Sequence, residues 1–245
     1  LNFIASHDGI GMRPAEGVLS DEDINNMLTR LKKNGSEFSM RKLKGTEDKV
    51  YEANISLFSA LQNIDADNNG IFALDRFIAA HCIILAIEGV PAFYFNSFFG
   101  TKNNKQSYLK SGIKRDLNRH KWNFSDLVSK IDDDQTHEFK CFSILKKLIS
   151  IRKSQPAFHP NATQFTLNID QSVFAVWRQS KNRKQSIFAI TNVTSSKFIF
   201  NTNMINLIDD EEWYDLLNPK TNFQDEQKIE LNPYQTIWIT NFKSE

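Results

Sequence analysis

The sequence predicts an α/β region followed by an all-β domain, and three observations support this fold class. First, residues 1–95 run in the order strand, helix, irregular insert, helix, strand, which suits parallel strands joined by a covering helix. Second, residues 164–240 are short β-branched or aromatic runs separated by polar turns, the spacing of an antiparallel sandwich or barrel. Third, Pro156 and Pro160 interrupt the chain between the two. We therefore predict domains at 1–160 and 161–245.

The α/β region begins with an apolar run over residues 1–6, which predicts a buried strand that ends at His7 and Asp8. Ser20 is expected to cap a helix that continues to about Lys33 and is ended by Gly35. Residues 37–50 are polar and basic, which predicts a loop.

A second helix is predicted over residues 71–88, which are apolar almost all round and therefore buried on most sides. "GVPAFYF" follows it and predicts a short buried strand, Val90–Phe95. Residues 101–121 carry seven Lys or Arg against one Asp and are predicted to form a basic loop. A long helix is then expected over residues 137–153.

Two arginines distinguish this basic loop from an ordinary lysine-rich surface loop. Arg115 and Arg119 lie four residues apart in "KRDLNRH", with Asp116 and Asn118 between them. Guanidinium groups suit the recognition of hydroxyl, carboxylate or phosphate groups. The loop also follows a predicted strand, which is the usual place for a site in α/β architectures.

The all-β domain is predicted from six short segments with β-branched or aromatic residues: "QFTLNI", "SVFAVWRQS", "SIFAITNV", "KFIFN", "KIEL" and "TIWIT". Its aromatic residues allow two interpretations, a stacking platform for sugars or ordinary core and interface residues, and we favour the second. The residues concerned are Trp177, Trp213, Tyr214, Tyr234 and Trp238.

Composition excludes several classes of protein. The 245 residues are 40% hydrophobic and 24% charged, which indicates a globular chain with a sizeable core. The net charge of +1 gives no reason to expect a nucleic-acid or membrane partner, and no apolar stretch reaches the roughly 20 residues that span a bilayer. Cys82 and Cys141 are expected to be buried, reduced thiols, which fits the cytoplasm.

Two motifs are weak candidates for metal ligands. "DADNNG" at residues 65–70 resembles the start of an EF-hand loop, but the twelfth position, which needs a bidentate carboxylate, is Arg76. We therefore interpret this motif as a polar turn. His81 stands among apolar neighbours and is expected to be a core histidine. No Cys/His spacing indicates a metal site, and no Gly-rich phosphate loop is present, so no metal or cofactor is predicted.

"NFIASHDGIG" resembles the region of the α-amylase superfamily of glycoside hydrolases in which a His-Asp pair closes the seventh strand of a (β/α)₈ barrel. "YEANISLFSAL", "GVPAFYF", "GIKRDLNRH", "LKKLISIRKSQPAF" and "NPYQTIWI" follow in the order and rough spacing of the sucrose-phosphorylase branch. The resemblance implies strands seven and eight of the barrel with their helices, followed by a C-terminal β-sandwich. "MRPAEG" and "YEAN" are most similar to glucosylglycerate and sucrose-6-phosphate phosphorylases.

The resemblance implies a retaining double displacement in which phosphate accepts glucose to give α-glucose 1-phosphate. Asp8 would be the acid that stabilises the transition state, and His7 would donate a hydrogen bond to the same sugar. Arg115 and Arg119 would bind the substrate glucoside or phosphate. Tyr51 and Glu52 would lie on the acceptor loop, where Glu52 replaces the glutamine of plain sucrose phosphorylases. Inorganic phosphate would be the co-substrate, with no cofactor.

In this family the nucleophile and the acid/base follow the fourth and fifth strands, upstream of the His-Asp pair. The resemblance therefore implies the C-terminal portion of a longer enzyme, whose partner is its own N-terminal part and which is expected to be inactive alone. Two alternatives stay open. One is a hydrolase or transglucosidase of the same superfamily, and the other is a non-catalytic carbohydrate-binding module on the β domain.

Overall fold

The computed structural model describes residues 1–42, 48–62, 70–205, 207, 212–221, 223 and 228–241. The chain forms two compact units. The first unit comprises Leu1–Asn2, Leu74–Pro91 and Ile144–Glu245, and the second comprises Phe3–Ala73 and Ala92–Ser143. The two units are defined by the contacts within each of them, and their segments alternate along the chain. The predicted domain boundary at residue 160 is a separate statement and stays a prediction.

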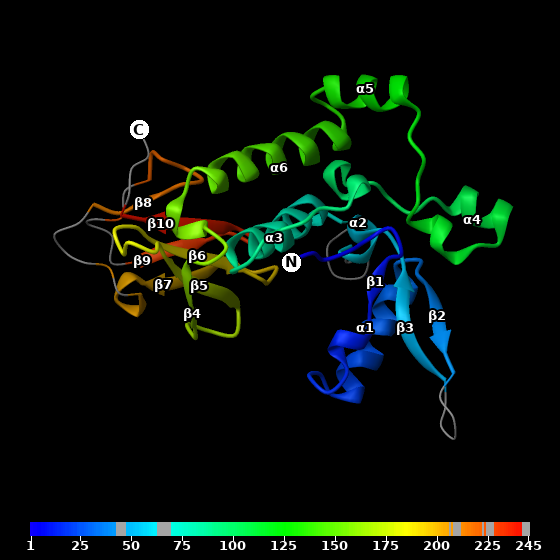
Figure 1. The fold of residues 1–245 in the computed structure, drawn as a ribbon, viewed down its shortest axis with the longest axis horizontal. Coiled ribbons are helices and arrows are strands. Elements are labelled where there is room, and N and C mark those ends of the chain that lie inside the picture. The colour runs from blue at the N-terminus through cyan, green and yellow to red at the C-terminus, as the bar shows by residue number, and fades with distance from the viewer. Residues whose placement is uncertain are drawn as a thin grey trace. The chain divides into compact units, whose positions relative to one another are not determined.

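The second unit is built around a small antiparallel sheet with the strand order β1-β3-β2 (Figure 1). Its strands are β1 (Ile10–Gly11), β2 (Glu37–Arg41) and β3 (Lys49–Asn54). The prediction of a loop over residues 37–50 is therefore wrong for residues 37–41 and 49–50. The reason is that Phe38 and Val50 supply apolar contacts within this polar run and pack against a buried cluster that includes Ala53 and Ile55.

Helix α1 (Asp21–Lys33) confirms the predicted first helix at both ends. The Ser20 hydroxyl accepts the Asp23 N–H at 3.1 Å, which satisfies a donor in the first turn. Gly35 follows the C-cap with φ +86°, a conformation that costs glycine little. Leu31 lies on the buried face of the helix and belongs to the same hydrophobic cluster as residues of the β1-β3-β2 sheet.

The remaining elements of the second unit are short. The prediction of a loop over residues 101–121 is wrong in part, because Asn104 caps a helix by accepting the Ser107 N–H at 3.0 Å, and Gly112 ends that helix with φ +70°. The elements are η1 (Arg13–Ala15), α2 (Leu57–Ala60), η2 (Phe95–Phe99), α4 (Lys105–Ser111), η3 (Lys114–Leu117) and α5 (Phe124–Asp132).

Neither of the two predicted buried strands, 1–6 and 90–95, is formed as a strand. Asn2 and Pro91 make a single parallel bridge, in which the Asn2 N–H donates to the Val90 carbonyl at 2.8 Å. The two segments therefore run parallel, as predicted, but they do not form strands. Phe3 is 56% exposed and Val90 is 50% exposed. Proline supplies no N–H to continue a ladder, and the 3-10 helix η2 begins at Phe95.

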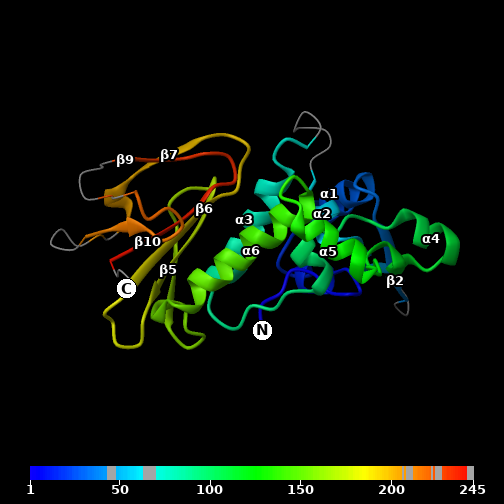
Figure 2. The same ribbon diagram turned by 90° about the horizontal axis from the view of Figure 1, so that it is seen from above.

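The first unit contains α3 (Ala73–Ala86) from Leu74 onward and α6 (His137–Lys153) from Ile144 onward, followed by η4 (Pro156–Phe158). Both long helices agree with the predicted ranges 71–88 and 137–153. Within this unit α3 and the end of α6 lie side by side (Figures 1 and 2). The Arg152 guanidinium joins them by donating to the Leu85 carbonyl at 2.8 Å.

An antiparallel β-sandwich completes the first unit (Figure 2). One sheet has the order β4-β5-β6-β10-β8 and the other pairs β7 with β9. Inward residues of both sheets form one core, including Phe188, Ile190 and Ile237 from the large sheet and Phe200 and Leu231 from the small one. The strands are β4 (Thr163–Leu167), β5 (Val173–Gln179), β6 (Ser186–Asn192), β7 (Phe198–Asn201), β8 (Tyr214–Asp215), β9 (Lys228–Leu231) and β10 (Thr236–Thr240).

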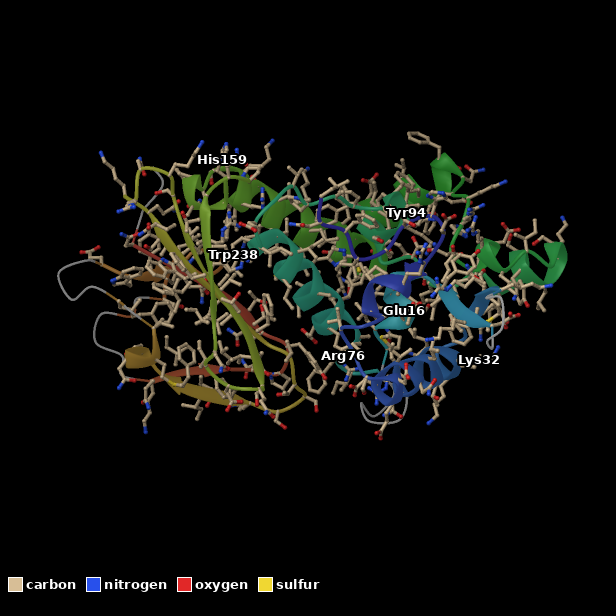
Figure 3. The ribbon with its side chains drawn as sticks, turned by 60° about the horizontal axis from the view of Figure 1, so that its bottom comes forward. Glu16, Lys32, Arg76, Tyr94, His159 and Trp238 are labelled. Atoms are coloured by element: carbon tan, nitrogen blue, oxygen red, sulfur yellow. The ribbon has the colours of Figure 1, made fainter. Side chains whose placement is uncertain are left out.

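All six segments predicted to be strands beyond residue 163 are confirmed. Trp213 and Trp238 are 3% and 0% exposed, and Trp177 packs against the sandwich core, as the core interpretation of these aromatics predicts. Trp238, labelled in Figure 3, packs edge-on against Phe158 with ring centroids 4.9 Å apart. Among the residues described, no helix combines the length and the apolar character needed to cross a membrane.

Candidate active site

His7 and Asp8 occupy the tip of a tight turn in the second unit. Ser6 and Gly9 exchange backbone hydrogen bonds of 3.0 and 3.1 Å, and the Ser6 hydroxyl also accepts the Asp8 N–H. Gly9 has φ +117°, and a Cβ there would lie 2.2 Å from the Ala53 carbonyl oxygen. Glycine is therefore required for this turn to lie against β3.

β3 presents the second part of the site. Its pairing with β2 slips between Ser39 and Met40, so that Ser39 faces Glu52 and Met40 faces Val50. Tyr51 is therefore the extra residue of a β-bulge, a feature that re-aims side chains next to active sites. Glu52 is 6% exposed, which is unusual for a carboxylate and requires polar partners.

Arg115 in η3 and Arg119, two residues after the end of η3, converge on these carboxylates. Arg115 makes a bidentate pair with Glu52, with Nε 3.0 Å from Oε1 and Nη2 2.7 Å from Oε2. Its Nη1 lies 3.2 Å from Asp8 Oδ1. Arg119 Nη2 donates to the same Asp8 oxygen at 2.7 Å, and Arg119 Nε donates to the His7 carbonyl at 3.0 Å. His7 Nε2 lies 3.3 Å from Asp8 Oδ1.

These groups differ in their access to solvent. The Asp8, Arg115 and Arg119 side chains are each about one-third exposed (34%, 36% and 34%), and His7 is 65% exposed. The pKa of Arg115 is raised, first by its hydrogen bonds to Glu52 and then by the charges of Glu52 and Asp8. Because Asp8 and both guanidinium groups keep an exposed edge, they can exchange their mutual contacts for a bound ligand.

A layer of buried amides holds the three segments together. Asn54 is fully buried, and its Nδ2 donates to the Asp8 carbonyl at 3.0 Å and to Glu52 Oε1. Asn118, 2% exposed, donates to the Ser6 carbonyl at 2.6 Å. The Tyr94 hydroxyl donates in turn to the Asn118 carbonyl at 3.1 Å (Figure 3).

The structure therefore brings together His7, Asp8, Glu52, Arg115 and Arg119, which the sequence singles out, with Tyr51 beside Glu52. Sequence reasoning missed Asn54 and Asn118. The signal for Asn54 was its place in "YEAN", two residues after Glu52, where alternate strand residues share a face. Nothing local marked Asn118, since its partner Ser6 is 112 residues away.

Chemically, the site combines one part-exposed carboxylate with two guanidinium groups and an imidazole. A carboxylate accepts hydrogen bonds from vicinal sugar hydroxyls, and guanidinium groups bind anions such as phosphate or carboxylate. The arrangement therefore suits a polyhydroxylated substrate that carries, or reacts with, an anionic group.

The other sequence candidates lie outside this cluster. His81 is 1% exposed with Nδ1 2.7 Å from the Phe77 carbonyl, as expected of a core histidine. Burial lowers the pKa of His81 to about 4. Cys82 and Cys141 are buried unpaired thiols whose pKa burial raises to about 12, as predicted. Residues 65–69 of the EF-hand-like motif lie outside the described residues.

No family model matches the chain. Among curated proteins, it is 32% identical over 240 residues to a glucosylglycerate phosphorylase of Allomeiothermus silvanus, covering 97% of this chain and 40% of that protein. It is 31% identical to a glucosylglycerate phosphorylase of Escherichia coli, with 97% and 41% covered. A sucrose phosphorylase of Bifidobacterium adolescentis is 24% identical over 73% of this chain and 34% of the relative. The chain thus spans about 40% of the length of the first two relatives.

Solved structures show a shared fold. The sucrose 6F-phosphate phosphorylase of Thermoanaerobacter thermosaccharolyticum superposes with a TM-score of 0.62 at 20% identity, covering 76% of this chain and 35% of that one. The trehalose-6-phosphate hydrolase of Bacillus licheniformis gives a TM-score of 0.53 at 17% identity, with 71% and 40% covered.

Proposed function

Since this chain is a homologue of the glucosylglycerate and sucrose phosphorylases, we propose that it is the C-terminal part of a retaining glucoside phosphorylase. The complete enzyme would transfer glucose from an α-glucoside to phosphate and release α-glucose 1-phosphate. The observation that carries this proposal is the convergence of Arg115 and Arg119 on Asp8 Oδ1, at 3.2 and 2.7 Å.

Asp8 is the proposed transition-state stabiliser. Its carboxylate would accept hydrogen bonds from neighbouring glucose hydroxyls, and these bonds would strengthen as positive charge develops on the sugar ring. His7 would donate to the same sugar from the tip of the turn. The one-third exposure of Asp8 supports this role, because the carboxylate has an edge on which a ligand can bind.

Arg115 and Arg119 would bind the anionic reactant. In this structure both guanidinium groups contact the Asp8 carboxylate. The position of Asp8 Oδ1 is therefore one at which two charged donors bind an anionic oxygen. Phosphate would exchange part of these contacts for its own oxygens, which carry the negative charge that guanidinium groups favour. Tyr51 and Glu52, on β3, would lie on the acceptor side of the site, where Glu52 holds Arg115.

A retaining displacement needs a nucleophile and an acid/base in addition to Asp8. We infer that these carboxylates, and the remaining strands of a (β/α)₈ barrel, belong to the part of the enzyme that corresponds to the other 60% or so of its relatives. Strands seven and eight of that barrel would include the Asn2 and Pro91 segments, whose parallel bridge supports this assignment. The 245-residue chain alone would then be inactive.

The acceptor, a sugar or an acid, is inferred from two residues of β3. Glu52, where plain sucrose phosphorylases tend to have glutamine, and Lys49, where they tend to have an aspartate of the acceptor loop, favour glucosylglycerate or sucrose 6′-phosphate over sucrose. Both favoured substrates carry an anionic group, which suits a site with two guanidinium groups.

The test is phosphorolysis by the complete enzyme on glucosylglycerate, sucrose 6′-phosphate and sucrose, each with and without phosphate. The expected result is release of glucose 1-phosphate that requires phosphate, with one of the anionic glucosides preferred. Release of free glucose at the same rate without phosphate would instead identify a hydrolase. Turnover by the 245-residue chain alone would overturn the inference that the nucleophile and the acid/base lie elsewhere.

A further inference from the structure

Glu52 is placed differently from the other charged groups of the candidate site. Its side chain is 7% exposed, whereas Asp8 and Arg115 are 34% and 36% exposed. Both of its carboxylate oxygens are already engaged, Oε1 by Arg115 Nε and Asn54 Nδ2, and Oε2 by Arg115 Nη2. A substrate would have to displace buried, charge-assisted hydrogen bonds to reach this carboxylate.

The side-chain amide of Asn54 is also fully hydrogen-bonded within the protein. Its Nδ2 has two N–H bonds, and these donate to the Asp8 carbonyl and to Glu52 Oε1. Its Oδ1 accepts the Ser39 hydroxyl at 2.8 Å from β2. The amide thus has a partner for each N–H and for its oxygen, and it is fully buried, so it has no capacity left for a ligand.

We propose that Glu52 and Asn54 are positioning residues that act on the reaction through Arg115 and Asp8. Together they form a bracket, defined here as the Glu52 carboxylate and the Asn54 amide, that fixes Arg115 relative to the Asp8 turn. This inference rests on the proposed function and specifies how Glu52 would take part in it, by holding Arg115 instead of touching the substrate.

The bracket determines which edge of Arg115 is offered to a ligand. With Nε and one N–H of Nη2 bound to Glu52, the guanidinium keeps its opposite edge for a ligand, formed by Nη1 and the second N–H of Nη2, and Nη1 lies 3.2 Å from Asp8 Oδ1. A bidentate pair has one planar geometry, so it fixes orientation as well as distance. Glu52 thereby converts a long, flexible side chain into a donor with a fixed direction.

The bracket also sets the charge around Asp8. Without Glu52, two guanidinium groups would face the single carboxylate of Asp8. Glu52 neutralises one of them from the buried side, and the pair of carboxylates balances the pair of arginines. Asp8 is then less tightly held by cations and can exchange their hydrogen bonds for those of sugar hydroxyls.

Asn54 links the two carboxylate-bearing segments directly. It holds the backbone of Asp8 and the side chain of Glu52 with one amide, across 46 residues of sequence. Gly9 packs against the Ala53 carbonyl, so the turn lies on β3. The hydrogen bond from Asn54 to the Asp8 carbonyl then fixes the position of the turn along the strand. Loss of Asn54 should therefore disturb Arg115 and Asp8 together.

The experiment compares E52Q and N54A with the matched variants E37Q and N26A in the complete enzyme. The Glu37 side chain is 28% exposed and its carboxylate pairs with Lys32, away from Arg115, and Asn26 is exposed on α1. Two readouts are taken: phosphorolysis kinetics with each active substrate, and the Arg115 Nε–Hε signal in a ¹⁵N-arginine spectrum, assigned by its loss in R115K.

E52Q and N54A are expected to lower kcat/KM by about 10–100-fold for every substrate alike, since a misplaced donor affects all of them. The Arg115 signal should weaken through faster hydrogen exchange in both variants and stay unchanged in E37Q and N26A. The double variant E52Q/R115K should lose little more than R115K alone, because Glu52 acts through that arginine.

Two results would overturn the bracket. One is an effect of E52Q confined to the KM of a single glucoside, with the Arg115 signal intact, which identifies Glu52 as a substrate contact. The other is an unchanged Arg115 signal in N54A. If the wild-type enzyme releases no glucose 1-phosphate from any substrate, the proposed function fails, while the ¹⁵N spectra still decide whether the bracket holds Arg115.

Discussion

Two pairs of arginines in this protein bind different acceptors, carboxylates in one unit and backbone carbonyls in the other. In one unit, Arg115 and Arg119 contact the carboxylates of Glu52 and Asp8 and keep about one-third of their side chains exposed. In the other unit, Arg178 is fully buried and donates to the Ala86 and His159 carbonyls at 2.7 and 2.9 Å. Arg152, beside it in the same unit, donates to the Leu85 and Gly89 carbonyls.

The two kinds of acceptor correspond to two roles. Arg152 and Arg178 supply donors to carbonyls at the C-terminal end of α3, which the helix itself leaves unsatisfied and whose dipole favours a cation. Burial lowers the pKa of Arg178 to about 10, whereas hydrogen bonding to Glu52 raises the pKa of Arg115. A buried arginine on backbone carbonyls stabilises the fold, and an exposed arginine on a carboxylate can exchange partners with a ligand.

The largest expected effect is that of D8N on catalysis. The change keeps the shape of the side chain and removes the charge that would face the developing positive charge of the sugar. We expect kcat of the complete enzyme to fall by about 10²–10³-fold, with the melting temperature nearly unchanged. Initial rates of glucose 1-phosphate release measure this. An unchanged kcat would remove Asp8 from the mechanism.

The converse effect is expected for R178M, which leaves the Ala86 and His159 carbonyls buried without their donor. The free energy of unfolding should fall by about 3 kcal/mol. K181M, an exposed lysine in the turn after β5, is the control and should change stability by less than about 0.5 kcal/mol. Chemical denaturation compares the two, and equal stability of both variants would contradict the capping role of Arg178.

A pH-dependent loss of stability is expected from His81, which lies in the same unit as Arg178. Its pKa is about 4 in the folded chain against 6.5 ordinarily, so between these values the unfolded chain binds a proton that the folded chain does not. Stability should therefore be complete above pH 6.5 and fall by up to about 3 kcal/mol as the pH approaches 4. H81Q should flatten this slope, and identical slopes in denaturation at pH 7, 6 and 5 would refute the assignment.

The smallest effect concerns the two cysteines. Because burial raises the pKa of Cys82 and Cys141 to about 12, almost no thiolate forms near neutral pH. Both should react with a thiol-specific disulfide reagent only after unfolding. Rapid titration of either thiol in the native protein would show that its region opens.

The unit that contains Arg178 was largely predictable from sequence, and the site only in part. The sandwich strands show local alternation, and "SIFAITNV" or "TIWIT" predicts a strand without knowledge of its partners. β2 and β3 are polar and are specified by pairing and by the contacts of Phe38 and Val50. The bidentate contact of Glu52 with Arg115 joins residues 63 apart, and no local pattern reveals such a partner.

The most direct measurement makes the same Arg→Met change in both regions and records rate and melting temperature together. We predict that R119M lowers kcat/KM by at least about tenfold while its melting temperature stays near that of the wild type, because the partners of Arg119, the Asp8 carboxylate and the His7 carbonyl, keep access to water. R178M should lower the melting temperature by several degrees while the folded fraction keeps its wild-type rate. A stable, fully active R119M enzyme, or an R178M enzyme that loses rate without losing stability, would contradict this division between binding and folding arginines.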